Sequence, residues 1–391
     1  MLLLLSCASG IRSMYEAERD AALGRADSPG ASWSPDIRVR LSSEALDRMV
    51  QDVVAQSVLS WKETLRLDGP LGIKAQVEPS GRVTSLTLSP STACDGCLSA
   101  AIGIAGKADW SAAGAKGSVP IEASLGATVS FELSRSGEAW ATSGRITSVD
   151  KVQVSSARLG SLDASDLLGG WLSEAVKEAG PVALGQLGGV DLPVRAARLA
   201  TPKGQLELQL LSDVPDGSPV NSGLSLSRDF EVRVSAPTLL ALARRQAFET
   251  GAIAYDVAAI PTSLSVNDQR FTMGLRLWKL KGVGWWRDYS VDGQFSVNGG
   301  ELALAAQQAT EGEKSKGAGL ADPIALLAEG RILEAITDGL KAAVPASSAL
   351  TVGNQQLRAR VREVQGDRGA LVLSGELEPV QAQDGGRRMT R

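Results

Sequence analysis

Histidine is absent from this sequence, and aromatic side chains and cysteines are scarce. The 391 residues include 0 His and 3 Cys, and Phe, Trp and Tyr together make up 4% of the chain. A protein without histidine cannot supply a Ser–His–Asp or Cys–His triad, a histidine general base or a histidine ligand for zinc. This absence excludes most familiar hydrolase mechanisms, and we expect no catalytic residue, no metal and no cofactor.

Short motifs of known chemistry are missing as well. The chain has no GxSxG, P-loop or GxGxxG pattern, and Ser173 and Lys177 are spaced i, i+4 instead of in the S-x-x-K arrangement of serine/lysine acyl enzymes. Two carboxylates that meet only in space would leave no such motif, so a carboxylate-based hydrolase stays as an alternative. The sequence favours a protein that is not an enzyme.

Positive charge is not in excess either. The formal net charge is −4, and no basic stripe with interleaved aromatic residues occurs along the chain. Nucleic-acid binding depends on Lys and Arg side chains that neutralise phosphates. We therefore expect no nucleic-acid partner.

Apolar runs are too short to cross a bilayer, which takes about 20 residues, but one short run stands at the N-terminus. The sequence MLLLLSC places leucines directly before Cys7 and resembles the lipobox at which bacterial lipoprotein precursors are cleaved and acylated. The run is shorter than the roughly 7 to 15 residues of a signal sequence, and no basic residue precedes it.

A polar stretch follows Cys7 as far as about Pro35 and is typical of a tether. We predict a lipid anchor at Cys7 and a protein of the bacterial cell envelope, on the periplasmic face of the outer membrane. The alternative is a cytosolic protein with a frayed apolar start.

The other two cysteines lie close together in the segment CDGC. Asp-Gly is a turn dipeptide, so we predict that Cys94 and Cys97 lie in a loop between strands and form a small disulfide in an oxidising compartment. A redox motif would be expected at the start of a helix, and a zinc site would need two further ligands.

The order of elements predicted from the sequence occurs twice. VRLSSEALDRMVQDVV, beginning at Val39, returns as VRVSAPTLLALARRQA, beginning at Val232, and both predict a short strand that leads through Ser into an amphipathic helix. WLSEAV at Trp171 is answered by RILEAI at Arg331, and the hairpin LPVRAARLATPKGQLEL by LRARVREVQGDRGALVL. Because arrays of short units usually need three or more copies, two copies indicate a pseudo-twofold molecule and not a solenoid.

The repeat divides the chain into two domains and their connections. The linker SDVPDGSPVNSG is rich in Pro, Gly, Ser and Asp, which are typical of loops. The predicted parts are a lipobox-like start and tether (1–36), a first domain (37–211), a linker (212–224), a second domain (225–379) and a polar tail (380–391).

Alternation of apolar and polar residues predicts long antiparallel strands. Ile73–Ser89 alternates around Ser80-Gly81, and residues 118–133 turn through Arg135-Ser136-Gly137 into residues 138–155. At about 3.3 Å per residue, sixteen residues extend roughly 50 Å, so the sheet has to twist strongly or coil around something. We predict an α+β fold with two tandem copies of a long, highly curved antiparallel sheet wrapped around an amphipathic helix.

This plan resembles the TULIP superfamily, typified by bactericidal/permeability-increasing protein and the lipid transfer proteins of plasma. The resemblance rests on the repeated VR(L/V)S start of a helix, on WLSEAV and RILEAI, and on the LPVRAARLATPKGQLELQL-type hairpin. It implies that acyl chains are held between helix and sheet. The basic N-terminal tip of the animal members is missing, which argues against endotoxin binding.

The apolar faces of the predicted helices are the expected walls of a ligand groove. They carry Leu46, Met49, Val50, Val53, Leu239, Leu242, Trp171, Ile332 and Ile336. Small strand residues would leave the groove open, namely Gly103, Ala105, Ala123, Gly126 and Ala127. The alternative is a packed core in which these small residues only allow close helix packing.

The segment LWKLKGVGWWRDY gathers aromatic and basic side chains around Gly282-Val283-Gly284. Trp285, Trp286, Lys281 and Arg287 form a predicted hairpin tip that could rest among lipid headgroups. The alternative is that the rings close the end of the second domain.

Two functions from different classes follow for a non-enzymatic protein. The first is a lipid- or hydrophobic-ligand-binding or shuttling lipoprotein, whose partners are an acyl-chain ligand and, through its anchor, a membrane. The second is an envelope scaffold with a solid core that binds a protein.

Overall fold

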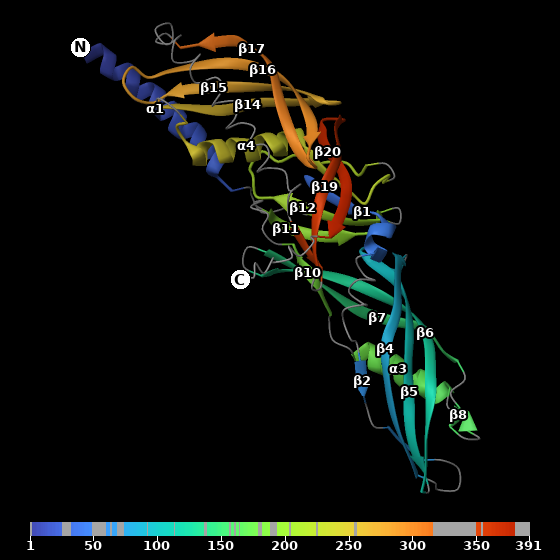
Figure 1. Cartoon of the computed structure of the whole chain (residues 1–391). Coiled ribbons are helices and arrows are strands. Elements are labelled where there is room, and N and C mark those ends of the chain that lie inside the picture. The colour runs from blue at the N-terminus through green and yellow to red at the C-terminus, as the bar shows by residue number, and fades with distance from the viewer. Residues whose placement is uncertain are drawn as a thin grey trace, which may run out of the picture.

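The chain forms mostly antiparallel sheets with few helices, as a computed structural model shows (Figure 1). The structure describes the whole chain except residues 1, 26–32, 49–59, 63–64, 69–73, 92, 113, 137–138, 156–157, 160–161, 164, 179–181, 188–193, 203–204, 224–225, 254–255, 316–348, 353–354 and 380–391. The molecule is elongated, with long strands at one end and a smaller sheet at the other.

One sheet of fourteen strands runs through both halves of the chain. Its strands are β1 (Ile37–Leu41), β2 (Ser60–Lys62), β3 (Leu65–Asp68), β4 (Lys74–Pro90), β5 (Cys97–Ala112), β6 (Ala115–Ser136), β7 (Ala139–Ser155), β10 (Val182–Leu187), β11 (Val194–Ala200), β12 (Leu206–Ser212), β13 (Phe230–Ser235), β18 (Ala349–Val352), β19 (Gln355–Asp367) and β20 (Ala370–Pro379). Their order is β11-β12-β1-β13-β20-β19-β18-β10-β7-β6-β5-β4-β2, with β3 paired to β4.

A second sheet of four strands and a few helices complete the described part of the fold. The second sheet consists of β14 (Val257–Asn267), β15 (Arg270–Lys279), β16 (Trp285–Asn298) and β17 (Glu301–Lys314), and β8 (Arg158–Leu159) pairs with β9 (Leu162–Asp163). The helices include α1 (Leu2–Leu23), α3 (Ser165–Glu178) and α4 (Ala236–Thr250). In the described part of the chain, no helix is long and apolar enough to cross a membrane.

The two halves meet in the middle of the large sheet, where β1 pairs with β13. Val39 lies opposite Val232, so the residues that begin the two sequence repeats face each other across an antiparallel pair. On their other sides, Val39 pairs with Leu208 of β12 and Val232 with Leu373 of β20. Strands from both predicted domains therefore belong to one continuous sheet.

One face of this central region carries buried charge. Arg40 and Arg233 are 3% and 5% exposed, and Glu231 lies between them, 2.6 Å from Arg40 Nη2 and 3.6 Å from Arg233 Nη1. Glu207, on the neighbouring strand β12, is fully buried and paired with Arg38. Buried charges are tolerated only when they are paired in this way.

The predicted linker covers this charged face. Arg38 Nε donates a hydrogen bond of 2.7 Å to the carbonyl oxygen of Val220. A Cβ at Gly223 would lie 2.4 Å from Arg40 Nη2 and 2.7 Å from Glu231 Oε1, so a side chain there would displace the charged side chains of this face. The described residues of the predicted linker are therefore packed on the sheet.

The opposite face of the central strands forms the main apolar core with the second sheet and α4. Ser235 caps α4, because its Oγ accepts a hydrogen bond of 3.3 Å from the Thr238 amide. Leu239 and Leu242 of α4 are 0% and 5% exposed and belong to this core, with Val232, Leu371 and other strand residues.

The N-terminal segment is a helix where a polar tether was predicted. In α1, Tyr15 and Ala22 are 6% and 7% exposed and pack with Phe248 of α4 and Trp278 of β15. Figure 1 shows α1 beside α4. The prediction of a polar tether from Cys7 to about Pro35 is wrong as far as Leu23. One face of this helix packs on an apolar partner more than 200 positions along the chain, as the contact of Tyr15 with Phe248 shows.

Candidate ligand site between α3 and the long-stranded sheet

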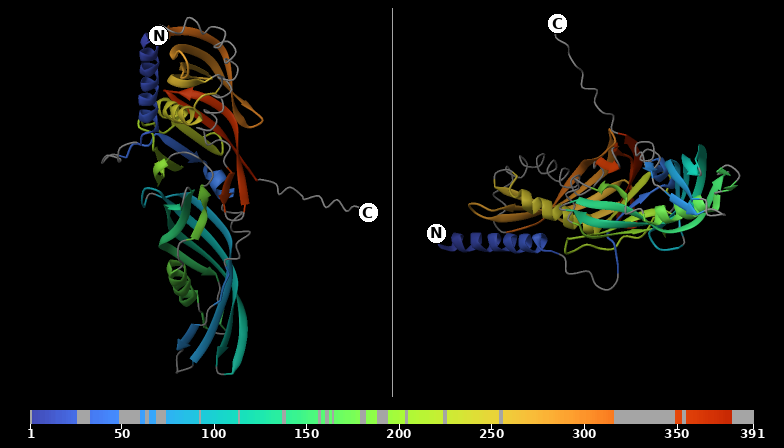
Figure 2. Two further views of the ribbon diagram at one scale, coloured as in Figure 1. Left: turned by 90° about the vertical axis from the view of Figure 1, so that its left-hand side faces the viewer. Right: turned by 90° about the horizontal axis from the view of Figure 1, so that it is seen from below.

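Strands β4 to β7 form the long end of the molecule, and one of their faces is apolar. Along β5, Leu98, Ala100, Ile104 and Ala108 are all at most 4% exposed. Alternation along a strand sends these residues to one face, while Lys107 points to the other. Figure 2 shows the four strands curving past α3, so the apolar face is the one that meets the helix.

Helix α3 supplies the other side of this interface. Leu168 and Leu172 are 0% and 2% exposed, and Trp171 is half-buried. Their i, i+3, i+4 spacing places all three on one stripe of the helix. Leu172 packs with Ile104 and Leu125, and Leu168 with Ile121 and Ala108.

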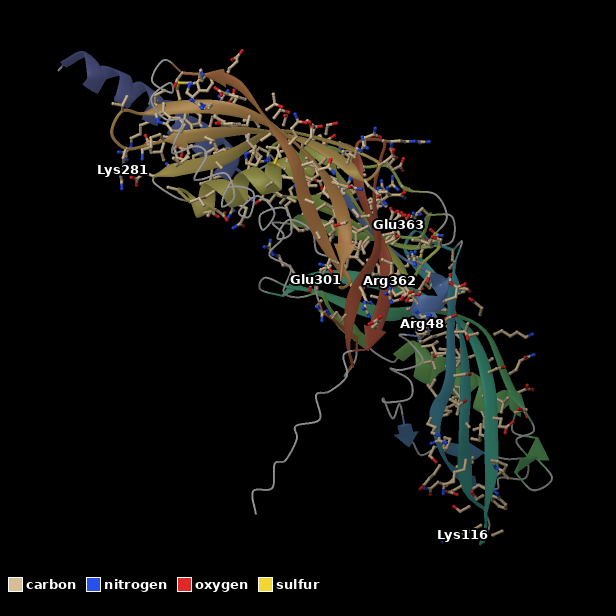
Figure 3. All side chains as sticks on the ribbon, turned by 45° about the horizontal axis from the view of Figure 1, so that its top comes forward. Arg48, Lys116, Lys281, Glu301, Arg362 and Glu363 are labelled. Atoms are coloured by element: carbon tan, nitrogen blue, oxygen red, sulfur yellow. A yellow bond between two sulfur atoms is a disulfide. The ribbon has the colours of Figure 1, made fainter. Side chains whose placement is uncertain are left out.

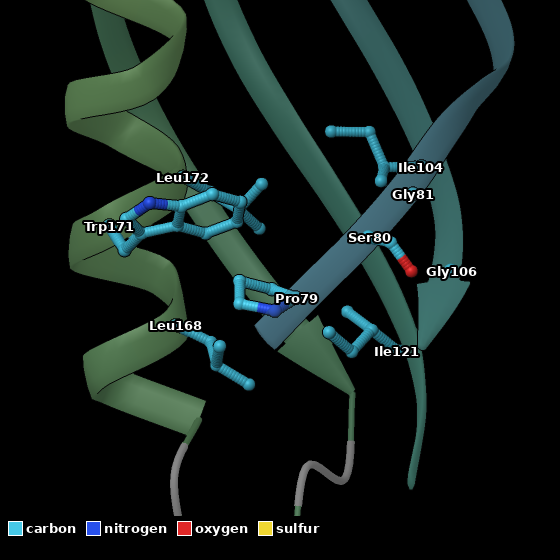
Figure 4. A pocket seen from close by; sticks show the side chains of 9 residues that line it. All are labelled: Pro79, Ser80, Gly81, Ile104, Gly106, Ile121, Leu168, Trp171 and Leu172. Atoms are coloured by element: carbon cyan, nitrogen blue, oxygen red, sulfur yellow. The ribbon is translucent and has the colours of Figure 1, made fainter. Parts of the chain in front are cut away.

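A small pocket lies between this stripe and the sheet. It is lined by Pro79, Ser80, Gly81, Ile104, Gly106, Ile121, Leu168, Trp171 and Leu172 (Figure 4). In Figure 4, Trp171 and Leu168 project from α3 towards Pro79 of β4. The cavity measures about 10 Å³, the space of about one water molecule, so an acyl chain fits only if a side chain that lines the pocket moves.

Two glycines bring the strands of the pocket floor close together. Gly81 of β4 pairs with Gly106 of β5. A Cβ at Gly106 would lie 2.1 Å from the Ser80 carbonyl oxygen and 2.6 Å from Gly81 Cα. The backbone of these two glycines therefore forms part of the pocket floor, and the Trp171 ring lines the opposite wall.

The small residues expected to open the groove are divided between the two faces of the sheet. Ala123 and Ala127 are 7% and 1% exposed and lie in the cluster beneath α3. Gly126 and Gly103 alternate with these inner positions and so lie on the outer face, as does Ala105. The prediction was wrong for these three, because neighbouring residues of a strand point in opposite directions.

The residues predicted to line one groove are distributed over two cores. Leu46 and Trp171 pack against the cluster beneath α3, whereas Leu239 and Leu242 lie in the main core with the second sheet. Met49, Val50, Val53, Ile332 and Ile336 lie outside the described residues. Sequence reasoning missed the strand residues of the pocket, although alternation along β4 to β6 indicates their shared face: Pro79, Gly81, Ile104, Gly106 and Ile121.

Most of the predicted hairpin tip is buried. Trp285 and Arg287 are 4% and 2% exposed, and Trp285 belongs to the main core. Trp286 points to the other face of β16, where the Arg276 guanidinium lies 4.4 Å from its ring and the apolar cluster around Tyr15 packs against it. Both rings therefore pack against protein, as in the alternative to a membrane tip, because the core covers one face of β16 and α1 contacts the other.

Lys281 remains exposed at the turn between β15 and β16. Its side chain is 77% exposed, and its Nζ lies 2.8 Å from Asp256 Oδ1. The hydrogen bond from Lys281 holds the pKa of Asp256 below its usual range.

Cys94 and Cys97 form a disulfide at the turn between β4 and β5. The Gly96 amide donates a hydrogen bond of 3.2 Å to Thr201 Oγ1, and the Thr201 amide donates one of 3.2 Å to Asp95 Oδ1. Gly96 has a φ of +80°, and a Cβ there would lie 2.7 Å from the Leu199 carbonyl oxygen. The disulfide turn therefore packs the long-stranded end against β11 of the central region.

The described residues contain no cluster of three or more cysteine, aspartate or glutamate side chains that could hold a metal ion.

No family model and no curated protein sequence matches this chain. Among solved structures, a lipopolysaccharide binding protein is 12% identical, with a TM-score of 0.33, over 90% of this chain and 100% of the other. P47 from Clostridium botulinum A2 is 11% identical, with a TM-score of 0.44, over 88% of this chain and 97% of the other. P47 of Clostridium botulinum E1 is 10% identical, with a TM-score of 0.43, over 88% and 100% of the two chains. The chain is thus distantly similar to these three structures. Similarities this low carry no conclusion about the ligand or the activity of this chain.

Proposed function

We propose that the protein is a non-enzymatic binder and carrier of lipid or another hydrophobic ligand, and that it holds the apolar part of the ligand between α3 and the inner face of β4 to β6. The observation that carries this proposal is the pocket beneath Trp171, which has apolar walls and a glycine floor. Apolar walls with few polar groups are typical of sites for hydrophobic small molecules.

Ligand entry requires a side chain of the pocket to move, because the cavity has the space of about one water molecule. Trp171 is the half-buried member of the α3 stripe, while Leu168 and Leu172 are fully covered. An outward turn of Trp171 would therefore enlarge the pocket while the two leucines still hold the helix on the sheet.

We also propose that the chain is an internal duplication of one sheet-and-helix unit. Ser42 Oγ accepts a hydrogen bond of 3.1 Å from the Ala45 amide, and Ser235 Oγ one of 3.3 Å from the Thr238 amide. These caps occupy equivalent places in the two repeats, as do Val39 and Val232. Matching caps and matching strand partners support two copies related by a local twofold axis.

The ligand site can be tested by filling it. Ile121 lines the pocket and is 5% exposed, so we expect Ile121→Trp to weaken binding of a fluorescent fatty acid by about tenfold or more. Overpacking costs about 1 to 3 kcal/mol, which the protein should survive folded. Displacement titrations with the fluorescent fatty acid measure the affinity, and circular dichroism checks the fold.

The matched control is Ser124→Trp on the same strand. Ser124 is exposed and faces away from α3, so the same new ring should leave fatty-acid affinity unchanged there. Equal binding by both variants, or no binding by the wild type, would remove the ligand site and favour the scaffold function instead.

We propose in addition that Cys7 is acylated and holds the protein at the membrane of the bacterial envelope. Its support is the sequence LLSC, in which leucines directly precede this cysteine. Cys7→Ala should move the protein from the membrane fraction that resists an alkaline carbonate wash to the soluble fraction of its native host, because carbonate releases proteins held only by surface contact; immunoblotting of the washed fractions measures this. Unchanged resistance to carbonate would rule out the anchor.

A further inference from the structure

Helix α1 is held firmly on the second half of the molecule. The ring centroid of Tyr15 lies 5.3 Å from that of Phe248 and 5.8 Å from that of Trp278. The interface extends over about three turns of α1. Its residues follow the i, i+4, i+7, i+11 spacing of one helical face, namely Ile11, Tyr15, Glu18 and Ala22. Burial raises the pKa of the Tyr15 hydroxyl, as expected for a ring inside an interface.

Ion pairs fix the direction of the helix. Glu18 lies 3.3 Å from Arg276 of β15 and 3.9 Å from Arg244 of α4. The hydrogen bond from Arg276 to Asp288 of β16 raises the pKa of Arg276 and orients its guanidinium. At the C-terminal end, Arg245 Nη2 donates a hydrogen bond of 2.8 Å to the Gly24 carbonyl oxygen.

The N-terminal part of α1 runs past the turn between β15 and β16. Ile11 lies against this turn, because a Cβ at Gly284 would come 3.3 Å from Ile11 Cβ. From Ile11 the helix continues back to Leu2, about 13 Å at 1.5 Å per residue. The leucine run Leu2–Leu5 therefore lies at the same end of the molecule as the turn (Figure 1).

The turn itself exposes an apolar side chain beside basic ones. Val283 is 52% exposed. Lys281 in the same turn and Arg12 of α1, next to Ile11 in the chain, have side chains that are 77% and 71% exposed, and each also pairs with a carboxylate, Asp256 and Glu16 respectively. Exposed apolar residues flanked by basic side chains are typical of segments that lie at a membrane interface. Figure 3 places Lys281 and Lys116 at opposite ends of the long axis.

We propose that the end formed by Leu2–Gly10 of α1 and the turn Leu280–Gly284 rests on a phospholipid bilayer, so that the protein stands end-on with its long strands pointing away. This inference rests on the proposed membrane location, and it is independent of the ligand site. Cleavage before Cys7 would remove Leu2–Leu5 from the acylated form, and an acyl group on Cys7, about 6 Å along the helix from Ile11, would then enter the bilayer at this end in their place. The Cys7→Ala chain is not cleaved and keeps the leucines.

The orientation can be measured with an environment-sensitive nitrobenzoxadiazole label on the full chain. Cys7→Ala leaves the disulfide pair Cys94 and Cys97 unreactive, and Val283→Cys or Lys116→Cys then adds one thiol. With vesicles of phosphatidylethanolamine and phosphatidylglycerol, we expect a blue shift of label emission at position 283 and none at position 116. Equal shifts at both positions, or no shift at position 283, would overturn the end-on orientation.

A second variant tests whether α1 sets the orientation. Tyr15→Ser or, if that variant fails to fold, Glu18→Arg should release the helix, so that the shift at position 283 is lost while the protein still floats with vesicles through its leucines. A shift at position 283 that survives release of α1 would overturn the role of the helix. Fatty-acid displacement measured on the same proteins does not depend on their orientation on the vesicle. A failure of the ligand site is therefore distinguished from a failure of the end-on orientation.

Discussion

Replacement of Glu231 by alanine is expected to lower the free energy of unfolding by about 3 to 5 kcal/mol. The cause is the loss of the carboxylate between two buried arginines, Arg40 at 2.6 Å and Arg233 at 3.6 Å. Removing one partner of a buried pair leaves the remaining charge poorly compensated, and that costs far more than the pair contributes at a surface. Urea unfolding followed by circular dichroism measures the effect.

Glu376→Ala is the matched control for this prediction. Glu376 also pairs with an arginine in the same sheet, Arg362 at 2.7 Å, but the two side chains are 42% and 37% exposed. Exposed pairs of this kind contribute about 0 to 1 kcal/mol. If Glu231→Ala is no more destabilising than Glu376→Ala, the charged face of β1 and β13 is open to solvent and the segment 213–223 does not cover it.

Replacement of Trp285 by alanine is expected to destabilise the protein by about 3 to 5 kcal/mol, the usual cost of truncating a buried tryptophan. Trp285 is 4% exposed and packs in the main core, so the loss combines transfer of the ring to water with the cavity left behind. Thermal and urea unfolding measure it, and vesicle flotation of the folded variant should match the wild type.

Val283→Ala, two positions earlier, is the control, because Val283 is 52% exposed and contributes little to stability in solution. A Trp285→Ala protein with unchanged stability and weaker vesicle flotation would place this ring at the surface, and would restore the membrane tip predicted from the sequence. The pair of variants therefore separates a core role for Trp285 from an interfacial one.

Local signals in the sequence predicted several elements correctly. The strand, serine and helix at the start of each repeat appear as β1 with the Ser42 cap and β13 with the Ser235 cap. The turn dipeptide between Cys94 and Cys97 lies at a hairpin between β4 and β5. Capping and turn chemistry involve residues a few positions apart, so the sequence contains all of the information that they need.

The candidate site was predicted only in part, because one of its two walls is a sheet. Trp171 belongs to an amphipathic stripe that is visible along one helix, and it does line the pocket. Pro79, Gly106 and Ile121 come from three strands whose register decides which residues share a floor. A shift of one residue would send each of them to the opposite face.

By itself, the sequence determined that no histidine is available for catalysis or metal binding. It also determined the local elements of this protein, namely long alternating strands and two strands that each lead through a serine cap into a helix. The tertiary structure alone decided that Val39 faces Val232 in one continuous sheet, that the linker covers buried charge, and that α1 packs on α4 and β15. The physical reason is that burial depends on partners distant in the chain. Nothing in the sequence shows whether the rings of Tyr15 and Trp285 are exposed or buried. Both are buried only because surfaces from distant parts of the chain pack against them.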